Sequence, residues 1–222
     1  MPAPLLYFVH GWGYDSSFWR PLCNDLSAFS CDFYEAGYFG HRQATIPPSH
    51  PYLAIGHSAG VMTILEQNDP LCQGLIALNG FACFAQSPSF PQGIPARVLQ
   101  RMSTRLEQSP ETTLSQFRSL CGEEYPALPQ IYETSRLKAG LEFLQCHDVR
   151  PVLPHWNKPL ITVTGNRDPL SPALTGLAYP PGFSLFWESH CWEGGHLLPI
   201  THVIQSAQLI RRIIRYIDRP SS

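Results

Sequence analysis

Short apolar runs recur along the chain, and most of them are separated by segments with the spacing of amphipathic helices. Continuous apolar runs of this kind are typical of strands that are buried on both faces of a parallel sheet. Strands that alternate with helices predict an α/β fold with about six mostly parallel strands flanked by helices. The predicted strands are Leu5–Val9, Cys31–Tyr34, Tyr52–Ile55, Gly74–Leu78, Pro159–Gly165 and Phe183–Trp187.

The pattern changes between the fourth and fifth predicted strands, from about residue 85 to residue 146. Apolar residues at helical spacing predict three helices there, with Ser109 as an N-cap, Pro110 at N1 and Gly122 as a helix-ending glycine. We expect this segment to be a small helical lid within one domain that spans residues 1–222. The three predicted helices are Ile94–Leu106, Ser109–Gly122 and Ile131–Gln145, and a further helix is predicted over Leu197–Ile217.

The composition narrows the classes of function. The chain has 44% hydrophobic and 14% charged residues and a net charge of −2, which gives no indication of a nucleic-acid partner. The apolar run Leu5–Val9 is too short for a signal peptide or a membrane span. Seven cysteines without a C-x-x-C pair favour reduced thiols in a cytoplasm, and none is spaced with histidines as in a zinc site. We therefore expect no metal, no cofactor and no membrane partner.

The segment Tyr52–Gly60 carries the strongest chemical signal. Its apolar half predicts a strand, and Val61–Glu66 after it predicts a helix. Between them lies Gly56-His57-Ser58-Ala59-Gly60, which matches the G-x-S-x-G pattern of a nucleophile elbow when a strand precedes it and a helix follows. Glycines at both ends let the strand and the helix approach closely. Ser58 is the predicted nucleophile; the alternative is an ordinary Gly-Ser turn.

Partners for this serine should follow other strands, because ligands bind at the carboxyl ends of parallel strands. Asp168 follows the fifth predicted strand, and His196 follows the sixth, after Gly194-Gly195. A serine hydroxyl needs an adjacent base, and an acid that orients the base. The order Ser58, Asp168, His196 is that of an α/β-hydrolase triad. Alternatives are Asp148 or Glu188 as the acid and His57, His190 or His202 as the base, although Asp148 lies at the wrong end of its strand.

The tetrahedral oxyanion of acyl transfer needs two backbone donors. The N–H of Ala59, which follows the nucleophile, is one candidate. The loop His10-Gly11-Trp12-Gly13 after the first strand should supply the other, and Trp12 is the best candidate in it. Trp12 can also line the mouth of a pocket, and His10 is expected to hold the loop in place.

These motifs resemble the α/β-hydrolase superfamily over nearly the whole chain. More narrowly, the sequence resembles the pimeloyl-acyl-carrier-protein methyl ester esterases of biotin synthesis, in the loop after the first strand, in the lid run 117–121 and in 140–150. The resemblance implies hydrolysis of a methyl ester on a pimeloyl chain tethered to a carrier protein. It also implies that these residues contact the substrate: Trp12, Ser58, Ala59, Phe117, Arg118, Ser119, Leu120, Cys121 and His196. The elbow departs from such enzymes, which often carry Trp before the serine.

Three functions remain open at this point. The first is a cytoplasmic, monomeric carboxylesterase for an ester bound to an acyl carrier protein. The second is a broad esterase or thioesterase for short acyl chains, with a small-molecule substrate. The third is an inactive hydrolase fold that binds a ligand or partner. The first predicts a docking surface, and Arg97, Arg101 and Arg105 recur every fourth residue, as on one face of a helix. A solvated helix face without a partner is the alternative for this stripe.

Overall fold

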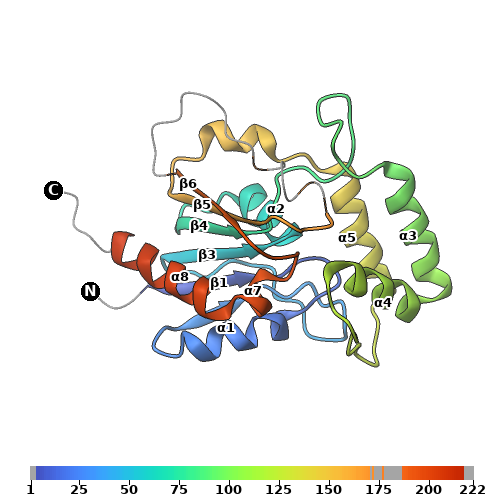
Figure 1. Ribbon diagram of the computed structural model, residues 1–222, viewed down its shortest axis with the longest axis horizontal. Helices are drawn as coiled ribbons and strands as arrows, with labels where there is room; N and C mark the ends of the chain where they lie inside the picture. Colours follow the sequence, from blue (N-terminus) through green and yellow to red (C-terminus); the bar gives the residue numbers. More distant parts are fainter. Residues whose placement is uncertain (1–3, 171, 173–176, 178–186, 218–222) are drawn as a thin grey trace.

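A six-stranded parallel sheet forms the centre of the protein. The computed structural model describes residues 4–170, 172, 177 and 187–217. The strand order is β2-β1-β3-β4-β5-β6, and every neighbouring pair is parallel, so all six strands end at one edge, called here the carboxyl edge (Figure 1). The strands are β1 Leu5–Val9, β2 Cys31–Phe33, β3 Tyr52–His57, β4 Cys72–Leu78, β5 Leu160–Gly165 and β6 Trp187–Trp192.

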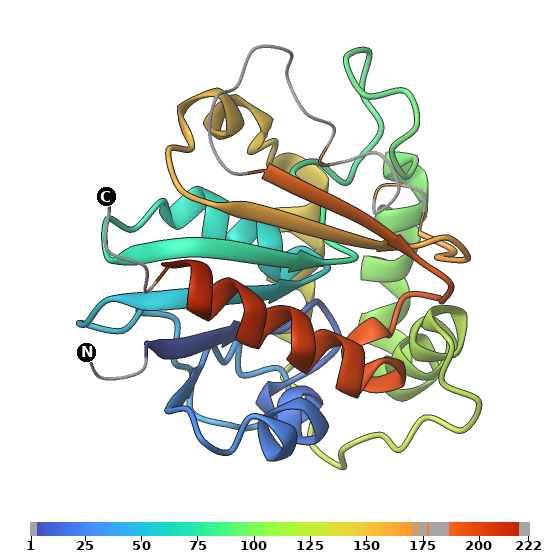
Figure 2. The same cartoon turned by 60° about the vertical axis from the view of Figure 1, so that its left-hand side comes forward.

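The four inner strands are apolar and almost fully buried, because helices cover both faces of the sheet. On one face lie α1 and α8, which contact each other; the opposite face carries α2, which packs on β3 and β1 (Figure 2). In the described part of the chain, the helices before residue 84 and after residue 147 are η1 Ser16–Trp19, α1 Arg20–Asp25, α2 Ala59–Gln67, η2 Arg150–His155, α7 Leu198–Thr201 and α8 Val203–Ile217. Among the described residues, no helix combines the length and apolar character needed to cross a membrane.

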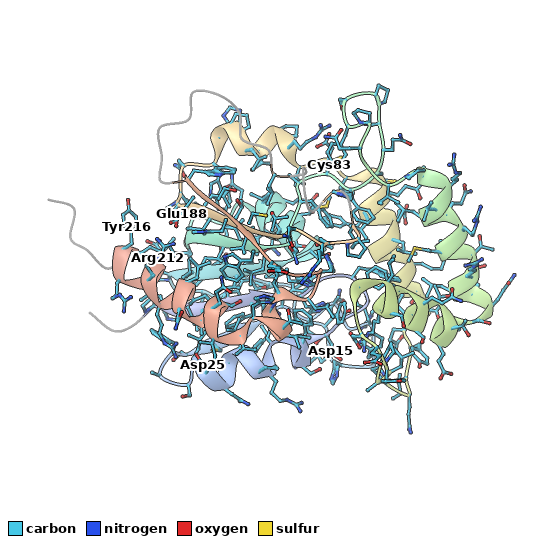
Figure 3. All side chains as sticks on the ribbon, in the orientation of Figure 1. Asp15, Asp25, Cys83, Glu188, Arg212 and Tyr216 are labelled. Atoms are coloured by element: carbon cyan, nitrogen blue, oxygen red, sulfur yellow. The ribbon has the colours of Figure 1, made fainter. Side chains whose placement is uncertain are left out.

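Three of the helices between β4 and β5 form a layer beyond the carboxyl edge (Figure 1). They are α3 Ala96–Gln108, α4 Pro110–Cys121 and α5 Thr134–Cys146, and we call residues 84–147 the helical insertion. Gly122 ends α4 with a left-handed φ of 112°, as its helix-ending role predicts. The two ends of the insertion meet, because Val149 N–H donates to Ala82 O at 2.8 Å and Cys83 forms a bridge with Asp148 (Figure 3).

The sixth strand differs from the prediction. The structure places β6 at Trp187–Trp192, whereas the predicted strand began at Phe183, and residues 183–186 lie outside the described part of the chain. β6 is the edge strand, and its side chains alternate between half-buried and exposed. An edge strand needs no continuous apolar run, so a search for such a run missed it. The predicted C-terminal helix is also divided, since α7 ends before His202 and α8 begins at Val203.

Candidate active site

Ser58 occupies a strained turn between β3 and α2. Its backbone has φ 55° and ψ −126°, a conformation that non-glycine residues rarely adopt. The turn is tight, because a Cβ on Gly60 would lie 2.2 Å from Val9 O, and one on Gly56 would lie 2.9 Å from Val61 and Ile64 side-chain atoms. The two glycines therefore allow α2 to start directly against β1, with Ser58 at the carboxyl edge and at the N-terminus of α2.

Asp168 and His196 form a buried pair at the same edge. His196 Nδ1 lies 2.7 Å from Asp168 Oδ2, and both side chains are fully buried. The other carboxylate oxygen of Asp168 accepts the Leu170 N–H at 2.8 Å, which fixes the carboxylate. The aspartate acceptor requires the proton on Nδ1 of His196, so a neutral imidazole exposes the lone pair of Nε2. That nitrogen is buried and has no hydrogen-bond partner among the described residues.

Ser58 opens onto an apolar cavity of about 80 Å³. Leu170, held by Asp168, lines the same cavity, so the serine and the acid–base pair lie around one space. Among the described residues, no charged side chain lines it, which suits a hydrocarbon chain. The lining residues are Trp12, Ser58, Phe81, Phe84, Ile94, Val98, Leu99, Met102, Phe117, Leu120, Leu141, Leu144 and Leu170.

The loop of residues 10–13, called here the oxyanion loop, passes close to the serine. A Cβ on Gly11 would lie 2.9 Å from Ser58 Cβ, so only glycine fits there without movement of the loop. Ala59 begins α2, and the first N–H groups of a helix have no partner within that helix. Gly11 of the oxyanion loop and Ala59 thus both adjoin Ser58, and the roles of the Trp12 and Ala59 N–H groups as oxyanion donors stay a prediction.

The buried carboxylate of Glu35 supports the oxyanion loop. Glu35 Oε1 accepts the Gly37 N–H at 2.9 Å and lies 3.6 Å from His10 Nε2, while Oε2 accepts the Ser16 N–H at 3.0 Å. Burial alone would raise the pKa of the Glu35 carboxyl, but His10 and the two backbone donors outweigh it and lower the pKa to about 2. The sequence analysis gave His10 this structural role and did not identify Glu35.

The helical insertion holds the other side of the oxyanion loop. The indole Nε1 of Trp12 donates to Leu137 O in α5 at 2.8 Å, and the Trp12 ring packs edge-on against Phe117 at 4.8 Å. Arg118 Nε donates to Gly13 O at 3.0 Å, and its guanidinium lies over the rings of Tyr14 and Phe39. Two insertion helices thus bind the loop that would carry one oxyanion donor.

The lid run 117–121 divides between two environments. Phe117 and Leu120 line the apolar cavity, and Leu120 is 55% exposed at its mouth. Arg118 and Cys121 are buried, Ser119 is exposed, and none of these three lines the cavity. Substrate contact by Arg118, Ser119 and Cys121 stays a prediction that the geometry around the cavity does not support.

The rival acids and bases have other partners. Asp148 pairs with Arg150 at the base of the insertion. Glu188 pairs with both His190 and Arg212, and Figure 3 shows Glu188 and Arg212 at the end of the sheet away from the insertion. His202 lies at the break between α7 and α8, where its Nε2 contacts Glu193 O. No group of three or more histidine, cysteine, aspartate or glutamate side chains in the described ranges could hold a metal ion.

His57 is buried directly before the nucleophile. Its Nε2 lies 2.8 Å from His196 O, and its ring stacks on Phe18. Burial, with repulsion from His196 as a lesser cause, lowers the pKa of the His57 imidazole well below its usual value, so the ring is neutral and Nε2 donates. The sequence analysis considered His57 only as a rival base, and its bond to the loop of His196 could not be read from the sequence.

Comparisons with known proteins agree with this geometry. No protein-family model matches the chain. A pimeloyl-[acyl-carrier protein] methyl ester esterase of Shewanella woodyi is 28% identical over 197 residues, which are 75% of this chain and 77% of that protein. The enzyme of the same name from Xylella fastidiosa is 26% identical over 202 residues, covering 78% and 79%. The biotin biosynthesis bifunctional protein BioHC of Saccharophagus degradans is 26% identical and matches 94% of this chain but 43% of its own length.

Solved structures resemble the whole chain. An esterase from Exiguobacterium antarcticum superposes with a TM-score of 0.79 at 14% identity, covering 96% of this chain and 92% of that one. A hydrolase from Oleispira antarctica gives a TM-score of 0.74 at 13% identity, with 96% and 91% covered. The predicted α/β-hydrolase fold and the resemblance to pimeloyl-carrier esterases are thus confirmed, and the chain is similar throughout to carboxylic ester hydrolases of the α/β-hydrolase type.

Proposed function

We propose that the protein is a serine carboxylesterase that hydrolyses the methyl ester of a pimeloyl group carried by an acyl carrier protein. The observation that carries this proposal is the buried Asp168–His196 pair at the same edge of the sheet as Ser58, which lines an apolar cavity. The curated relatives named for this reaction support the choice of substrate. The proposal also treats residues 1–222 as one domain in which the insertion acts as a lid.

In the proposed reaction, His196 Nε2 takes the proton of Ser58 as its oxygen attacks the ester carbonyl. The N–H groups of Trp12 and Ala59 stabilise the oxyanion, and Asp168 stabilises the imidazolium. His196 returns the proton to the methoxide, which leaves as methanol. Water, activated by the same base, then cleaves the acyl-enzyme and yields the free carboxylate on the carrier-bound chain.

The acyl chain would occupy the apolar cavity, with Trp12, Phe117 and Leu120 as walls. Burial of each methylene contributes roughly 0.8 kcal/mol, so a hydrocarbon chain gains affinity from this cavity without any specific polar contact. The mouth includes Val98 and Leu120, both of which are partly exposed in the insertion. A tethered chain can therefore reach Ser58 while its carrier stays outside.

The carrier itself would dock on α3. Arg97, Arg101 and Arg105 are exposed on this helix, and no ion pair among the described residues includes them. Glu107, the nearest acidic residue along the chain, pairs with Lys138 instead. A free basic stripe beside the cavity mouth suits an acidic carrier, since arginine binds carboxylate and phosphate through paired donors.

The test compares two substrates. Charge reversal in Arg97→Glu with Arg101→Glu should lower kcat/KM for the carrier-bound methyl ester about tenfold or more at low ionic strength, and less as salt screens the charges. Hydrolysis of p-nitrophenyl butyrate should be unchanged within about twofold, because the triad is untouched. Arg215→Glu is the matched control, since Arg215 is exposed in the last turn of α8, away from the insertion (Figure 1). Equal losses on both substrates, or none on either, would contradict carrier docking.

A broad esterase or thioesterase for short acyl chains is the second candidate. The small volume of the cavity favours it, because about 80 Å³ suits only a short chain until the insertion helices move apart. Turnover of p-nitrophenyl esters from acetate to decanoate, beside the pimeloyl-carrier methyl ester, separates the two candidates. A preference for the shortest esters, with no preference for the carrier-bound substrate, would favour the broad esterase; no turnover of any ester would favour an inactive binding module.

A further inference from the structure

Asn79 joins the two loops that carry the proposed acid and base. It follows β4 at the carboxyl edge and is fully buried. Its side-chain Oδ1 accepts the Gly165 N–H at 2.6 Å, at the start of the loop of residues 165–168. Its Nδ2 donates to Gly195 O at 2.8 Å, in the loop of residues 194–196. One amide therefore bridges the loop of Asp168, the acid loop, to the loop of His196, the base loop.

The orientation of this amide is fixed by its two partners. A backbone N–H can only donate and a carbonyl oxygen can only accept, so the Asn79 oxygen must face Gly165 and its nitrogen must face Gly195. The backbone of Asn79 is left-handed, with φ 48°, which asparagine tolerates better than other non-glycine residues. Aspartate would match the first contact but would place an oxygen against the Gly195 carbonyl.

The base loop is held at each of its three carbonyls. Arg167 N–H donates to Gly194 O at 2.9 Å, Asn79 binds Gly195 O, and His57 binds His196 O at 2.8 Å. The two loops are also in close contact, because a Cβ on Gly165 would lie 2.5 Å from both Gly194 O and Gly195 O. Two of these three donors are side chains, those of Asn79 and His57, and of the two only Asn79 also binds the acid loop.

We propose that Asn79 is a positioning residue that sets the placement of Asp168 and His196 relative to Ser58. This role rests on the proposed serine hydrolase mechanism. Without the bridge, the two loops stay joined at Gly194 through the Arg167 N–H and the Asn166 side chain, but Gly195 and His196 can shift against Gly165. The apolar cavity, which Asn79 does not line, keeps its shape. Loss of Asn79 should therefore slow proton transfer and leave ground-state binding of the acyl chain unchanged.

Two variants test the role without straining the backbone. Asn79→Gly removes both side-chain bonds and keeps the left-handed φ free of strain. Asn79→Asp keeps the acceptor for Gly165 and loses the donor to Gly195. Asn166→Ala is the matched control, because Asn166 is exposed and touches the same base loop only through Gly194 N–H, at 3.2 Å. Melting temperatures identify the variants that are folded at the assay temperature.

The measurements are kcat and KM for p-nitrophenyl butyrate and the rate at which a small fluorophosphonate labels Ser58. Labelling depends on the serine and its base and needs no occupied acyl cavity. In Asn79→Gly we expect kcat and the labelling rate to fall together by roughly 10²-fold, as for a misplacement of about 1 Å, with KM within about twofold. In Asn79→Asp, kcat and the labelling rate should fall by roughly tenfold or more, and in Asn166→Ala by less than about threefold.

The outcomes separate this inference from the function on which it rests. Folded Asn79→Gly or Asn79→Asp protein that labels at the wild-type rate would overturn the positioning role and leave the serine hydrolase intact. A rise in KM with unchanged kcat would also overturn the positioning role, because such a change would mean that Asn79 acts in substrate binding. Wild-type protein that neither labels nor turns over esters would overturn the proposed function itself, and the positioning role with it.

Discussion

The carboxyl edge of the sheet and the helical insertion are built in opposite ways. At the edge, Asn79, Asp168 and His196 are buried and bonded across three different segments of the chain. The insertion instead exposes apolar side chains such as Leu120 and lines the cavity with others, although Leu137 and Arg118 in it bind Trp12 and Gly13. A dense, buried polar network fixes positions, whereas a helical layer whose inner side is lined by apolar side chains can adapt to what it covers.

This difference assigns separate consequences to the two regions. Changes at the carboxyl edge should act on the rate of the chemical step and leave substrate preference alone. Changes in the insertion should act on which acyl chains are used and on how the carrier approaches. The oxyanion loop connects the two regions, because Glu35 supports it from the sheet and α4 and α5 hold it from the insertion.

The largest effect should come from Ser58→Ala. We expect kcat for any ester substrate to fall by roughly 10⁴- to 10⁶-fold, because the nucleophile is lost while the oxyanion donors remain. The melting temperature should not fall, since the Ser58 side chain makes no capping hydrogen bond to α2. Steady-state kinetics and a thermal melt check both parts. Residual activity above a few per cent of wild type would contradict the role of Ser58.

Asp168→Asn should have the next largest effect. An amide in place of the carboxylate can hold the wrong tautomer of His196, and we expect kcat to fall by roughly 10³- to 10⁴-fold. The relative rates on acyl chains of different length should stay as in the wild type, because Asp168 does not line the cavity. A changed chain-length profile would break the proposed separation of chemistry from selectivity.

Phe117→Ala tests the insertion side of the comparison. Phe117 lines the cavity and supports Trp12, so its removal enlarges the acyl site. We expect the preferred p-nitrophenyl ester to lengthen by about two carbons, with relative kcat/KM values shifting roughly tenfold, since a methylene contributes about 1 kcal/mol. Gln116→Ala, at the next position and exposed, is the control. A lower melting temperature with an unchanged profile would mean that Phe117 only packs the insertion.

Glu35→Gln should produce the smallest effect on activity and a clear effect on acid stability. The pKa of Glu35 is lowered in the folded state to about 2, below its unfolded value, so its stabilisation is complete above the unfolded pKa. That stabilisation is lost as pH falls from about 4.5 toward 2. We expect wild type to lose stability over this range and Glu35→Gln to lose less. Chemical denaturation at pH 3 and pH 7 measures the difference; equal losses would show that Glu35 does not support the fold in this way.

Much of the carboxyl edge was predictable from sequence. Parallel strands end together, so the residues that follow them had to converge, and Ser58 and His196 fell in glycine-rich turns that mark such sites. Asp168 was preferred to Asp148 because it follows its strand, whereas Asp148 precedes it; in the structure Asp148 lies beside Cys83 and pairs with Arg150. The inner strands, with their continuous apolar runs, were placed to within about two residues at each end.

The remaining features depend on contacts between distant segments. Asn79 also follows a strand, which was the one available signal, but its partners lie 86 and 116 residues away along the chain. Glu35 looked like an ordinary loop residue, because nothing in the local sequence indicates that its carboxylate supports the oxyanion loop. Arg118 was assigned to substrate by resemblance, and the structure shows a buried guanidinium that holds the Gly13 carbonyl instead.

The two ends of the insertion meet, and this has a consequence for how such proteins can diversify. Residues 82 and 83 pair with residues 148 and 149, so the two chain segments that connect the insertion to the sheet lie side by side. A segment whose ends already touch can be exchanged, lengthened or shortened with little change in the entropy of closing the loop, because that entropy varies only slowly with length. A chimera joined at Cys83 and Asp148 with the corresponding segment of a relative should therefore fold, as a cooperative thermal melt would show. Related proteins can in this way evolve different ester substrates while the catalytic residues at the carboxyl edge stay the same.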